Sequence, residues 1–316
     1  MWSKQNWLRG WQGLLIIGAL LALSCGRKEA RLTFVLCPKS LNNPYWYAAE
    51  DGMKAAAQKY QVNALFLAPP LADVAAQVSL IESLISKRVD GLAISPNDPD
   101  GIKSVIDRTI DTGIPTITFD SDAPQSKRIC YIGTDNYSAG RKAGEQIVTL
   151  LKGKGKVAII TGGLGALNLN QRIAGFRDEL KESGAAIEQV SIQACDDNTD
   201  IALNKMEDVT RSLPDLNAWF ITGCWATVAP KNAFLTAIGN RRDMVVVGFD
   251  TLPEQLQLVK EGIVQVLIGQ RPYDMGFKSI EVLYDIVVSK KMPASQFIDT
   301  GVDVVTAENV TQFLVK

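Results

Sequence analysis

Polar and aromatic side chains recur directly after the apolar segments that the sequence predicts as strands. Asn43, Tyr45 and Trp46 follow the first such segment, and Asp120 and Ser121 follow the fourth. In the second half of the chain, the residues after such segments include Asn170, Arg172, Trp225, Asp250 and Gln270. Ionised Asp forms charge-assisted bonds with hydroxyl groups, amides both donate and accept, and aromatic rings cover an apolar face. This combination suits a small, neutral ligand that carries many hydroxyls.

No arrangement of residues typical of an active site is visible in this sequence. The chain has no histidine, and no nucleophile is paired with a base. The glycine-rich segment 162–165 lacks the dinucleotide-binding spacing, segment 153–156 lacks the phosphate-loop spacing, and no calcium loop follows Asp196 and Asp197. We therefore expect a binding protein with no catalytic residue, no cofactor and no metal.

Each candidate residue also has a purely structural interpretation. Tyr45 and Trp46 fit the core at the start of a helix, Asp120 fits a turn cap, and Gln270 fits a solvated strand end. Asn43 fits the N-cap position of the helix that follows it. Their joint position at predicted strand ends favours the binding interpretation.

Predicted strands and helices alternate along the chain from residue 32. The first round has strands over 32–36, 62–67, 91–94, 115–119 and 129–132, with helices over 44–60, 71–87 and 101–112. The second has strands over 156–160, 187–192, 218–222, 244–247 and 264–268, with helices over 139–151, 170–183, 201–213, 229–238, 253–261 and 275–289. Near-continuous apolar strands and glycine after helices are typical of buried parallel sheets. The pattern predicts an α/β protein with two doubly wound, Rossmann-like lobes, whose ligands bind beyond the carboxyl ends of the strands.

The first 25 residues predict export. Lys4 and Arg9 precede a short apolar run that ends at Ser24 and Cys25. A run of about 10 residues is half of what a membrane span needs, so residues 1–24 are predicted as a signal peptide. Cys25 resembles the lipid-carrying cysteine of bacterial lipoproteins, with 25–30 as a lipidated linker. The alternative is an ordinary cleaved signal beside a chance cysteine.

Charge and cysteine content narrow the possible functions. Residues 1–24 hold two basic residues, Lys4 and Arg9, and no acidic residue. The rest of the chain therefore has 31 basic and 34 acidic residues, a net charge of −3. A nucleic-acid partner would require a basic surface. Cys195 and Cys224 fall at strand ends about 10 Å apart, too far for a disulfide. We expect free, half-buried thiols here and at Cys37 and Cys130.

Five segments carry a family resemblance. They are Leu41-Asn42-Asn43-Pro44-Tyr45-Trp46, Ile117-Thr118-Phe119-Asp120, Tyr131-Ile132-Gly133-Thr134-Asp135-Asn136, Val247-Gly248-Phe249-Asp250 and Ile268-Gly269-Gln270. In this order they resemble the ribose/galactose-type periplasmic sugar-binding proteins, the substrate receptors of ABC importers. The resemblance implies a type I periplasmic binding fold, a monosaccharide ligand and a permease partner. It places in the sugar site Asn43, Tyr45, Trp46, Asp120, Asp250 and Gln270.

Departures from the ribose pattern bear on the ligand. Ser121 and Asn170 stand where ribose binders carry arginine, and Gly223 stands where they carry asparagine. The Asp120-Ser121-Asp122 run is more similar to the glucose-binding branch, and Trp225 suits a wider pocket. We therefore expect a glucose-like aldose.

The resemblance also implies the domain organisation and the role. Lobe 1 is expected over 31–133 plus 271–299 and lobe 2 over 134–270 plus 300–316, joined by a three-segment hinge. The expected protein is a monomer, anchored outside the cytoplasm through Cys25, that closes on a sugar and delivers it to an importer. The alternative is a sensor that passes ligand occupancy to a chemoreceptor or histidine kinase. A DNA-binding repressor of the same fold would carry a helix-turn-helix where this chain has a signal peptide.

Overall fold

The computed structural model describes residues 31–314, which contain two six-stranded sheets. The first sheet has the order β11-β5-β4-β3-β1-β2, and all its strands are parallel. Its strands are β1 (Thr33–Cys37), β2 (Asn63–Phe66), β3 (Gly91–Ile94), β4 (Thr116–Phe119), β5 (Tyr131–Gly133) and β11 (Phe297–Asp299). Its helices are α1 (Trp46–Tyr60), α2 (Val74–Ser86), α3 (Pro99–Asp111) and α9 (Pro272–Tyr284), which continues as a π-helix over Asp285–Ser289.

The second sheet has the order β12-β10-β9-β8-β6-β7, and only β12 is antiparallel to its neighbour. Its strands are β6 (Lys154–Thr161), β7 (Ala186–Ala194), β8 (Ala218–Ile221), β9 (Val245–Phe249), β10 (Val266–Gly269) and β12 (Asp303–Thr306). Its helices are α4 (Asn136–Leu150), α5 (Leu167–Glu182), α6 (Thr199–Ser212), α7 (Lys231–Ala237) and α8 (Pro253–Lys260), with a short 3₁₀-helix over Val310–Gln312.

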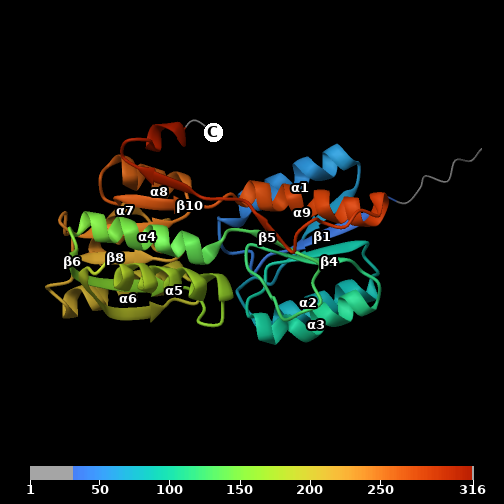
Figure 1. Cartoon of the computed structure of the whole chain (residues 1–316), viewed down its shortest axis with the longest axis horizontal. Coiled ribbons are helices and arrows are strands. Elements are labelled where there is room, and N and C mark those ends of the chain that lie inside the picture. Colours follow the sequence, from blue (N-terminus) through green and yellow to red (C-terminus); the bar gives the residue numbers. More distant parts are fainter. Residues whose placement is uncertain (1–30, 315–316) are drawn as a thin grey trace, which may run out of the picture. The chain divides into compact units, whose positions relative to one another are not determined.

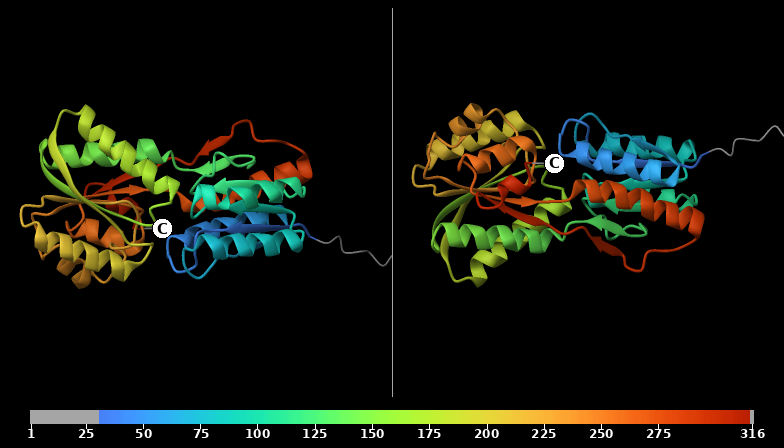
Figure 2. Two further views of the ribbon diagram at one scale, coloured as in Figure 1. Left: turned by 90° about the horizontal axis from the view of Figure 1, so that it is seen from below. Right: turned by 90° about the horizontal axis from the view of Figure 1, so that it is seen from above.

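Helices cover both faces of each sheet (Figures 1 and 2). In β1, Phe34 and Leu36 pack in the core beneath α1 and α9, while Val35 and Cys37 pack on the face covered by α2 and α3. This alternation follows from the two-residue period of a strand. In the second sheet, α4 and α5 cover one face and α6, α7 and α8 cover the other. The predicted fold class is therefore confirmed.

The chain passes from one sheet to the other three times. It crosses after β5 into α4, returns after β10 into α9, and crosses again between β11 and β12. These crossings connect the carboxyl ends of β5, β10 and β11, so the two carboxyl edges are joined by three chain segments.

Two helix pairs pack backbone against backbone through glycine. A Cβ atom at Gly140 of α4 would lie 2.1 Å from the carbonyl oxygen of Arg172 in α5. A Cβ atom at Gly276 of α9 would lie 1.9 Å from the carbonyl oxygen of Ala49 in α1. The missing side chains let each pair approach closely, and the pairs α4–α5 and α1–α9 position residues at the carboxyl edges of the sheets.

Several expectations need correction. β11 and β12 were not predicted from the sequence, because neither has the continuous buried apolar run of the other short strands: the two ends of β11 are exposed, and Val305 is the one buried residue of β12. α5 begins at Leu167, three residues earlier than predicted, and α9 begins at Pro272 rather than at residue 275. The four cysteines among the described residues are free, as expected, but all are fully buried rather than half-buried.

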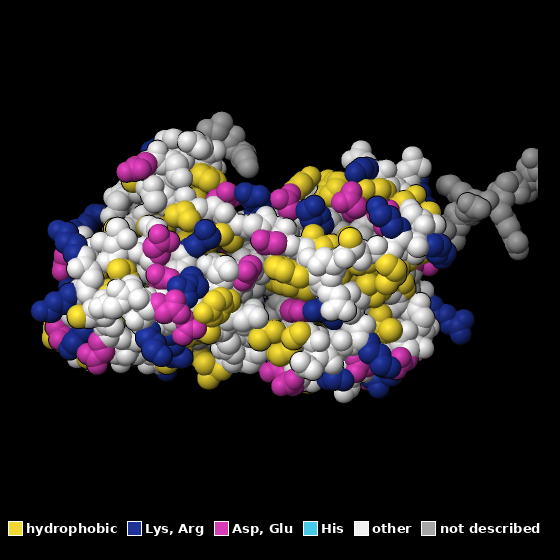
Figure 3. Space-filling model, in the orientation of Figure 1, with side chains coloured by type: hydrophobic (Ala, Val, Ile, Leu, Met, Phe, Trp, Pro, Cys, Tyr) yellow, Lys and Arg dark blue, Asp and Glu magenta, His cyan; other side chains and the backbone are white. Residues whose placement is uncertain are grey.

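The described surface is mixed in charge. Basic and acidic side chains are interspersed over the face shown in Figure 3. None of the helices within residues 31–314 has the length and apolar character needed to cross a membrane. The predicted signal peptide over 1–24, the linker over 25–30 and Cys25 lie outside the described residues.

Candidate functional site

A narrow cavity lies where the carboxyl ends of the two sheets meet. The structure places eight of the ten predicted site residues in its wall: Asn43, Tyr45, Trp46, Asp120, Arg172, Trp225, Asp250 and Gln270. The wall also contains residues outside that prediction: Lys39, Asn168, Leu169, Asp197, Gly223 and Cys224. Side chains from both sheets and from α1 and α5 therefore surround one space.

Two predicted residues lie elsewhere. Ser121 is fully buried beside Asp120, but its side chain does not line the cavity. Asn170 lies in the first turn of α5, where its amide donates a 2.8 Å hydrogen bond to the carbonyl oxygen of Leu164. Because α5 begins at Leu167, Asn168 rather than Asn170 faces the cavity.

Asp120 is the central acceptor on the side of the first sheet. The Tyr45 hydroxyl donates to one carboxylate oxygen at 3.1 Å, and the Ser95 hydroxyl donates to the other at 2.7 Å. The Tyr45 and Trp46 rings meet edge to face, with centroids 4.9 Å apart, and Trp46 packs in the same way on Phe119. These contacts fix the carboxylate beside two aromatic rings. This arrangement suits a ligand that has hydroxyl groups along its edge and an apolar face.

Arg172 organises the side of the second sheet. Its guanidinium is buried and donates to the side-chain oxygens of Asn136 at 2.9 Å and Gln270 at 2.6 Å, and to the backbone oxygen of Thr222 at 2.7 Å. The Gln270 amide in turn donates to an Asp250 carboxylate oxygen at 2.8 Å. The chain of bonds therefore orients Gln270 and Asp250 toward the cavity.

The two central carboxylates occupy matching positions. Asp120 follows β4 and Asp250 follows β9, and each comes directly after a phenylalanine. Both residues have left-handed backbone conformations, with φ of 60° for Asp120 and 76° for Asp250. Asp tolerates this conformation better than most residues, and such strain concentrates at functional sites.

Several buried polar groups of the cavity wall have no protein partner. Among the described residues, the indole N–H groups of Trp46 and Trp225 and one carboxylate oxygen of Asp197 find no hydrogen bond. The Lys39 ammonium, which is also buried, donates to the Asn168 side-chain oxygen at 2.8 Å and has further N–H groups to offer. Buried polar groups are almost always paired in native proteins, so these groups are available to a ligand that both donates and accepts.

Burial shifts the pKa of the charged groups. Loss of solvent raises the pKa of Asp250 to about 6, although Arg172 and the Gln270 amide favour its charged form. Burial also raises the pKa of Asp197 and lowers that of Lys39, in each case against the attraction of the opposite charge. The site therefore contains charged groups of both signs in a poorly solvated space.

Sequence reasoning missed three polar wall residues, each with a recognisable signal. Lys39 lies two residues beyond β1, Asn168 lies in the turn that opens α5, and Asp197 lies in the loop after β7. All three follow strand ends, the rule that identified the other residues. Lys39 and Asn168 escaped because a lysine near a strand end and a helix-start asparagine each have common structural roles.

Taken together, the structure has two α/β sheets whose carboxyl edges enclose a polar cavity, as expected of a ligand-binding protein. The chain belongs to the periplasmic binding protein domain family, whose model matches residues 34–291. The ribose import binding protein RbsB of Salmonella typhimurium is 27% identical over 281 residues, which cover 89% of this chain and 93% of that protein. The D-ribose/D-allose-binding protein of Pseudomonas aeruginosa is 27% identical over 297 residues, which cover 89% of this chain and 90% of that protein.

Solved structures agree with this assignment. An ABC transporter solute-binding protein from Burkholderia graminis, solved in complex with D-arabinose, is 37% identical, with a TM-score of 0.84. The match covers 90% of this chain and 98% of that one. GanP, a glucose-galactose binding protein from Geobacillus stearothermophilus, is 31% identical, with a TM-score of 0.82 and coverage of 88% and 98%.

Proposed function

We propose that this protein captures an aldose monosaccharide outside the cytoplasm and delivers it to the permease of an ABC importer. A sugar-binding role in such an importer is the function that the family and the relatives support. These relatives are binding proteins rather than enzymes. The aldose, its contacts and the lipid anchor are the further parts of the proposal.

One observation carries the proposal: the cavity wall combines fixed acceptors with unpartnered donors. Asp120 and Asp250 accept bonds from two sides, while Lys39 and the indoles of Trp46 and Trp225 offer N–H groups. Each sugar hydroxyl donates one hydrogen bond and accepts others, so a ring of hydroxyls satisfies both kinds of group. The aromatic rings then cover the apolar face of the sugar.

The proposed mechanism is closure of two lobes around the sugar. We assign residues 31–133 plus 271–299 to lobe 1 and 134–270 plus 300–316 to lobe 2. The three crossings between the sheets then form the hinge. A sugar that touches residues of both lobes binds the closed state better than the open state and shifts the equilibrium toward it.

A glucose-like pyranose is our proposed ligand. Among the solved relatives, one is named a glucose-galactose binding protein and another is bound to D-arabinose. Ser121 leaves no arginine after Asp120, so the pattern expected for ribose is incomplete. Trp225 lies in the wall from the second sheet and is suited to cover a pyranose face.

Export and membrane attachment complete the proposal. The predicted signal peptide directs the chain out of the cytoplasm, and Cys25 carries the lipid that anchors it. The protein acts as a monomer, with a permease as its partner and no nucleic acid, in keeping with the interspersed surface charge.

The test is calorimetric titration of the purified protein with D-glucose, D-galactose, D-arabinose and D-ribose, supported by thermal unfolding. An aldose that binds the folded state raises the melting temperature, by about 5 °C when its concentration is 100 times the dissociation constant. Asp120→Asn should weaken binding, whereas Asp111→Asn, at an exposed residue, should not. Absence of binding for all four sugars at millimolar concentration would refute an aldose ligand.

A further inference from the structure

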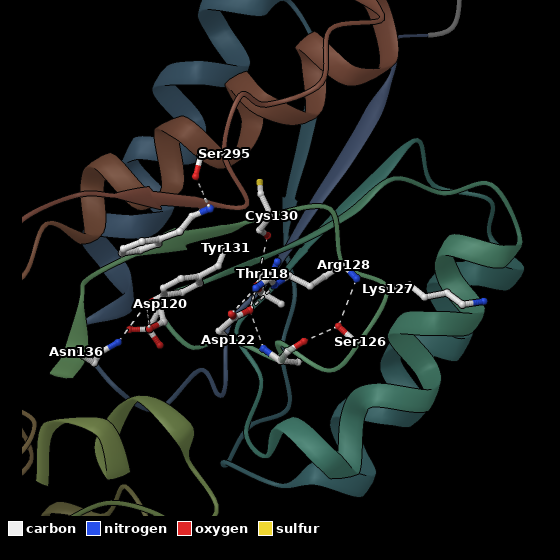
Figure 4. Close-up of polar contacts among 12 residues, drawn as sticks. Thr118, Asp120, Asp122, Ser126, Lys127, Arg128, Cys130, Tyr131, Asn136 and Ser295 are labelled. Atoms are coloured by element: carbon white, nitrogen blue, oxygen red, sulfur yellow. Dashed lines mark hydrogen bonds and ion pairs between the residues drawn. The ribbon is translucent and has the colours of Figure 1, made fainter. Parts of the chain in front are cut away.

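Tyr131 connects the candidate site to a crossing between the sheets (Figure 4). It lies at the start of β5, the strand that leads into the first crossing. Its buried hydroxyl lies 2.9 Å from the backbone oxygen of Asp120 and 3.0 Å from that of Thr134. The same hydroxyl accepts a 3.1 Å hydrogen bond from the Asn136 amide. One oxygen atom thus joins the end of β4, the crossing and the start of α4.

Packing leaves the Tyr131 ring little freedom. The ring of Phe297 in β11 stacks on it, with centroids 5.4 Å apart and planes 9° from parallel. On the other side, a Cβ atom at Gly133 would lie 2.4 Å from the Tyr131 hydroxyl oxygen. The glycine makes room for the hydroxyl, and the stacked ring holds it there. Because β11 leads into the third crossing, Tyr131 also contacts the strand that directly precedes that crossing.

The bonds continue from Asn136 to the second crossing. The Asn136 side-chain oxygen accepts from Arg172 at 2.9 Å, and Arg172 donates to Gln270, which begins the crossing after β10. The Thr134 hydroxyl also donates to the Gln270 side-chain oxygen, at 3.0 Å. A continuous network therefore runs from Asp120 through Tyr131 to Gln270.

Asp120 is a cavity residue that this network holds through its backbone. Its left-handed backbone is unfavourable for most residues, and its backbone oxygen meets the Tyr131 hydroxyl. Its carboxylate lines the cavity. A hydrogen bond to the backbone oxygen therefore stabilises the conformation that directs the carboxylate toward the ligand.

We propose that Tyr131 is a positioning residue that couples the placement of Asp120 to the hinge. The inference rests on the proposed function, since it takes Asp120 as a sugar contact. The Tyr131 hydroxyl has one hydrogen atom. At any moment it donates a full hydrogen bond either to the backbone oxygen of Asp120 or to that of Thr134, but not to both. Rotation of the lobes changes the backbone at Thr134, so the strength of the bond to Asp120 changes with it. Closure of the hinge and the position of the Asp120 carboxylate thereby both depend on hydrogen bonds of the Tyr131 hydroxyl.

The experiment is calorimetric titration of Tyr131→Phe with the aldose that the wild-type protein binds. Phenylalanine keeps the stacking on Phe297 and removes only the hydroxyl. We expect the dissociation constant to rise about fivefold, as for loss of one buried neutral hydrogen bond. The matched control is Tyr60→Phe, which loses a tyrosine hydroxyl bonded to Glu281, away from the cavity, and should bind normally.

A double-mutant cycle separates positioning from general stability. Combined with Asp120→Asn, the Tyr131→Phe change should cost less affinity than it does alone, because its effect passes through Asp120. A merely structural role would lower the melting temperature and leave the two effects on affinity multiplicative. Wild-type affinity in Tyr131→Phe, or multiplicative effects, would overturn the inference.

A second variant keeps the test decisive if Tyr131→Phe fails to fold. Asn136→Ala removes the donor to the Tyr131 hydroxyl and the acceptor of Arg172, although Asn136 does not line the cavity. The same loss of affinity and the same coupling to Asp120→Asn are expected, and independence from Asp120 would overturn the inference. If the wild-type protein itself binds no aldose, the proposed function fails, an outcome distinct from normal binding by the variants.

Discussion

Lys39 and Asn168 are joined across the cavity by a 2.8 Å hydrogen bond from the ammonium to the side-chain oxygen. Lys39 follows β1 of the first sheet, and Asn168 lies in the first turn of α5 on the second sheet. The bond therefore exists only while the two carboxyl edges are close together. Because both residues line the cavity, we expect Lys39 to contribute both to closure and to ligand binding.

Lys39→Met should weaken sugar binding by about 10- to 100-fold. Methionine keeps most of the apolar length of the side chain but removes the ammonium, and hydrogen bonds to charged groups contribute about 1.5–3 kcal/mol. Isothermal titration with the bound aldose measures the change. Lys154→Met, at an exposed position in β6, is the control and should bind as the wild type does. Equal affinity in the two variants would remove Lys39 from the ligand contacts.

Sugar affinity should fall as the pH drops below about 6. The folded-state pKa of Asp250 is raised to about 6 by burial, so the carboxylate takes up a proton near that pH. A protonated carboxyl loses its charge-assisted bonds to hydroxyls, and protons then compete with sugar by up to about tenfold in affinity per pH unit. Arg172, Gln270, Asp120 and Cys224 surround this group and set the midpoint.

Titrations between pH 5 and 8 test this assignment. Asp250→Asn should bind weakly at every pH and lose the dependence near pH 6. The effect on folding has the opposite sign. Because the pKa of Asp250 is higher in the folded than in the unfolded chain, where it is near 4, its protonation stabilises the fold at pH values below about 4. This contribution to the free energy of unfolding is lost as the pH rises through about 6. If the pH dependence persists in Asp250→Asn, another group, such as the buried Asp197, is responsible.

The intrinsic fluorescence should report sugar binding. Trp46 and Trp225 line the cavity, whereas the buried Trp219 donates its indole N–H to Thr210, away from the cavity. Sugar contact changes the surroundings of the first two indoles and leaves the third unaltered. Trp219→Phe should therefore keep the emission change, and the double variant Trp46→Phe/Trp225→Phe should lose it. A full response in that double variant would place the sugar elsewhere.

The fold was predictable because its signals are repeated along the chain. Apolar strands and amphipathic helices alternate over about 250 residues, so an error in one element does not alter the pattern. The exceptions are short segments whose structure depends on partners distant in sequence. β11 has three residues and is stabilised by pairing with β5, which lies more than 160 residues earlier. Nothing local to Phe297–Asp299 indicates that pairing.

The residues of the cavity wall were predictable where residue type and strand end coincide. Asp120 and Asp250 were found because an acidic residue directly follows a buried strand. Asn170 was predicted for the cavity wall, where the structure has Asn168 instead. The start of α5 was predicted three residues late, which left Asn168 outside the helix, and residues two apart lie about 200° apart around a helix, so only one of the two asparagines faces the cavity. Lys39 was missed because its buried position depends on the approach of the second sheet.

Cys25 should determine membrane attachment. If the signal is cleaved before Cys25 and the thiol is lipidated, the wild-type protein sediments with membranes and partitions into detergent. Cys25→Ala should move it to the soluble extracytoplasmic fraction. Cys37→Ala is the matched control, since that thiol is buried in the first sheet and should not affect fractionation. Continued attachment of Cys25→Ala would indicate another anchor.

Gly140→Ala should reduce both stability and sugar affinity. The new Cβ atom would lie 2.1 Å from the Arg172 carbonyl oxygen, so α4 and α5 must move apart. Overpacking of this kind costs about 1–3 kcal/mol of folding free energy, measurable by urea unfolding. Because α5 carries Arg172 and Asn168, its shift should also raise the dissociation constant. Gly163→Ala is the control, since a Cβ atom there meets nothing within 4 Å. A Gly140→Ala protein with lower stability and unchanged affinity would show that the site tolerates movement of α5.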